Sequence, residues 1–110
     1  MANPVYKILG QAAPASTANA DLFTVASGHH NIVSTLVIAN TTGTAATARV
    51  FARIGGATAA TSNAVMYDVS IAANSTNSFT LGISMNAADV LTVQTGTSNA
   101  LTFTAFGVEI

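Results

Sequence analysis

The sequence predicts an all-β protein, an antiparallel β-sandwich of jelly-roll-like type with about eight strands. Three observations support this fold class. Apolar and polar residues alternate with a period of two through most of the 110 residues, whereas the spacing typical of amphipathic helices is absent. Clusters of Gly, Asn, Ser and Thr interrupt this alternation about every 8–12 residues, which is the spacing of sandwiches and barrels. Val, Ile and Thr, which favour strands, are abundant.

The alternating segments give the strands in order along the chain. Between them, small-residue turns fall at 26–28, 40–44, 73–75 and 95–99, and residues 55–64 form a longer loop that opens with two glycines. Residues 82–89 are expected to be a connector with room for one helical turn. The expected strands are residues 5–10, 22–25, 31–40, 47–54, 65–71, 78–81, 90–94 and 101–109.

One stretch, residues 11–20, lacks large side chains and contains Pro14. Proline breaks any helix that the alanines favour, so we expect a flexible loop or arm here. This stretch cannot offset its ordering cost of roughly 1–2 kcal/mol per residue by burying its own side chains. The length fits one domain, and we expect residues 1–110 to form a single β-sandwich.

The strongest strand, residues 31–40, carries apolar residues on both alternating faces. Strict alternation places Ile32, Leu36 and Ile38 on one face with Ser34. The opposite face then has Val33, Thr35, Val37 and Ala39. We therefore expect this strand to be covered on both sides.

Two further strands carry most of the charge. In residues 47–54, Arg49 and Arg53 flank Phe51 on the more exposed face. In residues 65–71, alternation places Asp68 opposite a neighbouring arginine, and cross-strand pairing of Asp68 with Arg49 or Arg53 is expected. The two faces of the latter strand are predicted to be Val65, Tyr67, Val69 and Ile71 against Met66, Asp68 and Ser70.

The low charge excludes several classes of function. Charged residues make up 6% of the chain against a typical ~25%, and the net charge is −1. Three Lys and Arg residues cannot form the basic surface that nucleic-acid binding requires. No apolar run of about 18 residues is present to cross a membrane, and the absence of cysteine excludes disulfides. Because free monomers usually need charge to stay soluble, we expect much of the surface to be covered by other subunits.

The sequence offers one candidate pair of metal ligands, His29 and His30. Adjacent strand residues point to opposite faces, so one chain can present at most one imidazole to an ion. A solvated turn is the favoured interpretation, and the alternative is a metal site shared between subunits. We expect no metal, no cofactor and no catalytic residues.

Enzymatic alternatives find little support in the motifs. The chain has no Gly-x-Ser-x-Gly elbow, and Gly55-Gly56 lacks the lysine of a phosphate-binding loop. The carboxylates could act as a glycosidase pair only if folding placed two of them in one cleft. Phe79 and Phe103 are expected in the core, and no Trp is present to form a sugar-binding platform.

Several segments resemble a family of short virion structural proteins of tailed bacteriophages, especially phages of aquatic bacteria and cyanobacteria. In that family a single polar residue usually precedes the long strand, where this chain has His29-His30, so the resemblance says nothing about this loop. The similarity runs over nearly the full length, although each piece is short. Its pieces are residues 6–11 around Leu9-Gly10, the stretch around Pro14, residues 22–25, 33–40, 81–83, 89–93 and 103–109 with Phe106-Gly107.

The resemblance implies a structural protein of the virion without enzymatic activity. Our first hypothesis is a capsid decoration (cement) protein on the outside of the phage head, with the major capsid protein and copies of itself as partners. A homotrimer is the preferred state, although a twofold contact serves equally well. The alternative hypothesis is a tail-fibre or tail-associated module that binds a host receptor or glycan.

Overall fold

The computed structural model describes residues 3–110, and eight strands with two short 3-10 turns make up their regular structure. Of these described residues, no helix is long and apolar enough to span a membrane. The elements are β1 (Val5–Ala12), β2 (Ala20–Thr24), β3 (Asn31–Asn40), β4 (Ala46–Arg53), η1 (Ile54–Gly56), η2 (Thr61–Asn63), β5 (Ala64–Ile71), β6 (Thr76–Met85), β7 (Val90–Thr95) and β8 (Leu101–Glu109).

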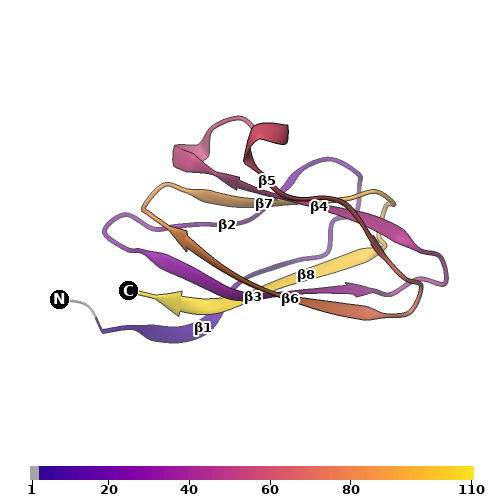
Figure 1. Cartoon of the computed structure of the whole chain (residues 1–110), viewed down its shortest axis with the longest axis horizontal. Helices are drawn as coiled ribbons and strands as arrows, with labels where there is room; N and C mark the ends of the chain where they lie inside the picture. Colours follow the sequence, from indigo (N-terminus) through magenta and orange to yellow (C-terminus); the bar gives the residue numbers. More distant parts are fainter. Residues whose placement is uncertain (1–2) are drawn as a thin grey trace.

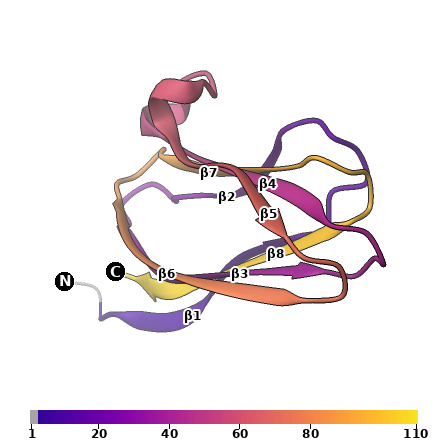
Figure 2. The same ribbon diagram turned by 45° about the vertical axis from the view of Figure 1, so that its right-hand side comes forward.

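The strands form two stacked four-stranded antiparallel sheets, with strand orders β1-β8-β3-β6 and β2-β7-β4-β5. Figures 1 and 2 show the two layers and the connection between β4 and β5, which projects from the outer side of the second sheet. Only β4 and β5 are consecutive strands of the same sheet; every other connection crosses between the sheets. This order is that of a jelly roll, and it confirms the predicted all-β sandwich.

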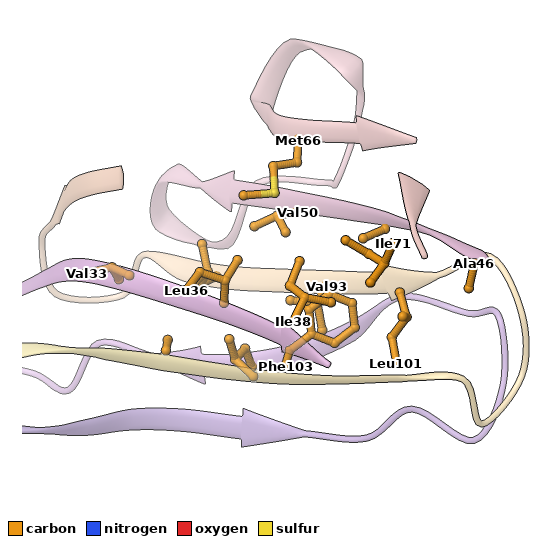
Figure 3. Close-up of a cluster of buried hydrophobic side chains, with 14 of the residues drawn as sticks. Val33, Leu36, Ile38, Ala46, Val50, Met66, Ile71, Val93, Leu101 and Phe103 are labelled. Atoms are coloured by element: carbon orange, nitrogen blue, oxygen red, sulfur yellow. The ribbon is translucent and has the colours of Figure 1, made fainter. Parts of the chain in front are cut away.

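The core lies between the two sheets, where both inner faces contribute aliphatic side chains (Figure 3). Phe103 of β8 is fully buried at its centre, as predicted. Phe79 of β6 is partly buried and packs against the same cluster. The largest fully buried aliphatic side chains are Leu36, Ile38, Ile71, Leu91, Leu101, Val25, Val33, Val50 and Val93.

Two expected connectors are shorter than the sequence predicted. The connector expected at residues 82–89 is wrong in its extent, because Gly82 adopts a φ of +64° and strand β6 continues through it to Met85. Residues 86–89 form a tight turn in which Asp89 accepts a hydrogen bond from the Asn86 amide, 2.9 Å. The loop predicted at 11–20 is also reduced to residues 13–19, since β1 extends to Ala12 and β2 begins at Ala20.

A β-bulge at Ser34 changes the two faces of β3. Ser34 is one extra residue relative to β8, because Val33 pairs with Gly107 while Thr35 pairs with the adjacent Phe106. The predicted grouping of Ile32 with Leu36 and Ile38 is therefore wrong: Val33 joins them in the core, and Ile32 is 36% exposed. The second sheet covers one side of β3, and the other side faces outward.

A similar irregularity in β5 reverses part of its predicted pattern. Asp68 has a φ of +55°, and the pairing with β4 shifts between Val69 and Met66. Val69 and Ile71 pack inward, but Val65 and Tyr67, which were predicted to share their face, are exposed, and Met66 enters the core instead. The extra residue thus leaves Tyr67 and Asp68 together on the outer surface of the sheet.

Candidate functional site

Three ion pairs hold six of the charged side chains, and two of these pairs lie on the outer face of the β2-β7-β4-β5 sheet. Arg49 of β4 donates two hydrogen bonds to Asp68 of β5, at 2.6 and 3.2 Å. Its guanidinium also lies 4.0 Å from the centre of the Tyr67 ring. The predicted cross-strand partner of Asp68 is thus confirmed as Arg49. The third pair joins Lys7 and Glu109, 2.9 Å apart, at the ends of β1 and β8.

These pairs shift the ionisation of their members. The hydrogen bond from Arg49 lowers the pKa of Asp68, and the same bond raises the pKa of Arg49. The hydrogen bond from Lys7 likewise lowers the pKa of Glu109. Both carboxylates are therefore held in the charged form by a specific partner, which is the state of a structural ion pair and not that of a general acid.

Arg53 anchors the connection that follows β4. Its guanidinium donates to Asp21 at 3.0 Å and to the Gly56 and Ala57 carbonyls at 2.9 and 2.6 Å. Asp89 accepts a hydrogen bond from the Gly55 amide, 2.8 Å, beside its bond from Asn86. Each of the four Asp and Glu side chains therefore has a structural partner of its own.

The two histidines occupy the turn before β3. The His30 backbone exchanges hydrogen bonds with Ile110 in both directions, and its Nδ1 lies 3.0 Å from the Asn86 Oδ1. His30 is exposed, whereas His29 is half-buried with a buried Nδ1 that has no protein partner. Within residues 3–110, no three His, Asp or Glu side chains converge as a metal site would require.

The β4–β5 connection builds a groove on the outer face of the second sheet. Ala59, Ala60 and Thr61 of this connection line the groove together with Phe51. Phe51 is only 4% exposed, so its expected exposure beside the two arginines is wrong. Asn63 fixes the connection by accepting from the Ala60 amide and donating to the Thr58 carbonyl. The resulting groove has a volume of about 380 Å³ and is lined by Asn19, Arg49, Phe51, Ala59, Ala60, Thr61, Tyr67 and Gln94.

The outer face of the other sheet has the opposite character, and we call it the neutral face. Its outward side chains form four cross-strand rows and include no ionisable Lys, Arg, Asp, Glu or His. The rows containing Lys7 and Glu109 point to the inner side, because both include fully or nearly fully buried residues of β3. The neutral face consists of Tyr6, Val108, Ile32 and Ser84; Ile8, Phe106, Thr35 and Thr80; Gln11, Thr104, Val37 and Ser78; and Thr102, Ala39 and Thr76.

One end of the neutral face is an apolar patch. Tyr6 is 83% exposed, and Ile8, Phe106 and Ile32 are 55%, 37% and 36% exposed. They occupy neighbouring positions in the first two rows, across β1, β8 and β3. The sequence analysis did not identify this patch, because its four residues come from three strands whose alignment depends on the bulges at Leu9 and Ser34.

No known protein family matches the chain, and no curated protein sequence matches it. Among solved structures, it is similar in fold to a chain in the structure of infectious bursal disease virus, Gx strain. The superposition has a TM-score of 0.53 and 17% sequence identity, and it covers 97% of this chain. The chain spans 31% of the length of that viral chain. At this identity the similarity shows the shared fold, which is one that a virus uses.

Proposed function

We propose that this chain is a structural protein of a virus particle, and more specifically a decoration protein that clamps capsid subunits on the outside of the head. One observation carries the proposal. All three Lys and Arg side chains form ion pairs with carboxylates of the same chain, and the fourth carboxylate is hydrogen-bonded to backbone amides. Within residues 3–110, every Lys, Arg, Asp and Glu side chain thus has a partner in its own chain, whereas a broad neutral face stays open to other protein subunits.

Two similarities support a virion as the setting. The fold is shared with a chain of infectious bursal disease virus, and segments of the sequence resemble short virion proteins of tailed phages. A bacteriophage head, its major capsid protein and further copies of this chain are the partners that this proposal names. The role involves no catalytic step and no cofactor.

The physical effect of such a protein is stabilisation by mass action. A protein that binds only the assembled shell stabilises it by RT ln(1 + [L]/Kd) per site, about 2.7 kcal/mol at a concentration of 100 Kd. Many copies multiply this effect over the particle. Because the contacts are uncharged, we expect binding to weaken little as salt rises.

The test uses particles from which this protein has been stripped. They are expected to assemble and to retain their genome, but to release it at a lower temperature than complete particles. Adding the purified protein back should restore heat resistance almost equally at low and at high salt. Stripped particles with unchanged heat resistance would contradict the decoration role.

A second candidate function rests on the groove above the second sheet. Its lining combines the amides of Asn19 and Gln94 with the Arg49 guanidinium and the half-exposed ring of Tyr67. Planar polar groups beside an aromatic ring are suited to a neutral hydroxylated ligand such as a cell-surface glycan. If the chain is instead a tail-fibre module, stripped particles keep their heat resistance and lose adsorption to cells. A Tyr67→Ala variant should then fail to restore adsorption when it is added back.

A further inference from the structure

We infer that the neutral face is a self-association surface, on which a second copy of this chain packs sheet against sheet about a twofold axis. This inference depends on the distribution of charge and apolar area, and it holds whether or not the chain belongs to a virus.

The two outer faces of the sandwich differ sharply in charge. The face of the β2-β7-β4-β5 sheet carries the Arg49–Asp68 and Arg53–Asp21 pairs. The neutral face has no ionisable side chain except the phenol of Tyr6 across its four rows. A sheet face exposed to water normally carries charged residues, and the centres of protein interfaces are depleted of them. The difference indicates that the neutral face is covered in the working state.

The apolar patch supplies the driving force for covering this face. Tyr6, Ile8, Ile32 and Phe106 are half of the eight large apolar side chains that the described residues leave exposed. Tyrosine and phenylalanine are also the residue types enriched at the energetic centres of interfaces. Contiguous exposed apolar residues of this kind mark contact sites on soluble proteins.

The rest of the face favours a second copy as the occupant. Its rows are completed by Thr, Ser and Gln, whose hydroxyl and amide groups both donate and accept hydrogen bonds. A surface of such groups is complementary to itself, because a twofold axis brings donors and acceptors of the same set together without repulsion between like charges. A charged partner would instead lose its hydration opposite this face without gaining a counter-charge.

The dimensions of the face are sufficient for a stable pair. Its four strands are eight to ten residues long, so at about 3.3 Å per residue and about 4.8 Å between strands the face measures about 30 by 19 Å. A face of about 600 Å² reaches the lower end of the roughly 600–1,000 Å² that each partner buries in a stable interface. Sheets that pack face to face in this way align their strands at a small angle. The twofold arrangement, which the sequence left open beside the threefold one, needs only this one surface.

The test compares the mass of the purified protein in solution with that of two lysine variants. Multi-angle light scattering at tens of micromolar should give the mass of two copies. Ile8→Lys places an ammonium group in each half of the contact and should weaken association by roughly 100-fold or more. Val65→Lys is the matched control, because Val65 is a similarly exposed aliphatic residue on the opposite sheet, and it should leave the pair intact. Circular dichroism should show the same folded spectrum for all three proteins.

Cysteine labelling tests the same association independently, without a lysine substitution in the contact. The chain has no cysteine, so Thr80→Cys on the neutral face and Val65→Cys on the other face each provide a unique thiol. Alkylation of the Thr80→Cys thiol should slow severalfold between dilute and concentrated protein, while that of Val65→Cys should not change. The proposal is wrong if the wild type has the mass of one or of three copies, if Ile8→Lys remains paired, or if the Val65→Cys thiol is the one protected.

Discussion

Gly107 illustrates how closely single residues determine the packing of this sandwich. A Cβ atom at this position would overlap the Ile32 carbonyl of the neighbouring strand β3, which is backbone and cannot move aside cheaply. Gly43, in the turn before β4, has open space around the corresponding point. An added methyl group would therefore meet backbone atoms at Gly107 and open space at Gly43.

We expect Gly107→Ala to lower the free energy of unfolding by about 2 kcal/mol or more, since the overlap forces β8 and β3 apart. Gly43→Ala should change it by less than about 1 kcal/mol, because only the flexibility of the unfolded chain is affected. Urea unfolding of both variants measures the difference. Equal effects would show that the close approach of β8 to β3 does not contribute to stability.

The ion pairs predict a loss of stability in acid. The folded-state pKa values of Asp68 and Glu109 are lowered, so their pairs stabilise the fold above the ordinary pKa of a free carboxyl, about 4. This contribution is lost as the pH falls through the lowered values. We expect the melting temperature of the wild type to approach that of an Asp68→Asn, Glu109→Gln double variant as the pH falls from about 6 to about 2. Melting curves that differ by the same amount at every pH would contradict this assignment.

At the scale of elements, the bulges determine which side chains enter the core. In β5, regular alternation places Val65 inside and Met66 outside, and the irregularity at Asp68 produces the reverse. We expect Met66→Ala to cost about 2–3 kcal/mol and Val65→Ala less than about 0.5 kcal/mol. Thermal or urea unfolding of the two variants shows which of the two side chains lies in the core. A larger loss of stability for Val65→Ala would support regular alternation, with Val65 inside.

The connection at residues 13–19 is the element that we expect to change on assembly. Pro14 is buried and its carbonyl accepts from the Asn99 amide, while the Thr17 carbonyl accepts from Gln94. Residues 15–19 are otherwise exposed and have no large side chains to hold them. Hydrogen exchange should be fast there in the free protein and slower in the assembled particle. Equal protection in both states would count against a role of this segment in assembly.

These elements also show how far the sequence predicts the fold. Runs of strand-forming residues bounded by turn residues located β3 and β8 to the residue, and the charge pattern predicted that Asp68 pairs with Arg49 or Arg53. Which residues of β3 and β5 face the core could not be predicted from the sequence. A bulge is one extra residue in a strand, and no residue type at Ser34 indicates it. The groove escaped prediction because residues 57–61 are small and without periodicity, so nothing indicated that they cover Phe51.

At the scale of the whole molecule, the two outer faces of the sandwich differ in their content of charged residues. One outer face holds paired charges and a polar groove, and the other is neutral and partly apolar. A sandwich with an intact core and one uncharged face is suited to permanent contact with another protein, and we propose a second copy of this chain as that partner.

We propose that the chain is a structural component present in many copies on the capsid, and counting its copies in the virion tests this most directly. Quantitative mass spectrometry of purified particles, with the major capsid protein as the internal standard, gives that number. We expect hundreds of copies per particle, in a fixed ratio to the capsid subunits. A few copies per particle, or none, would contradict the decoration role, and a number of a few tens would place the chain in the tail.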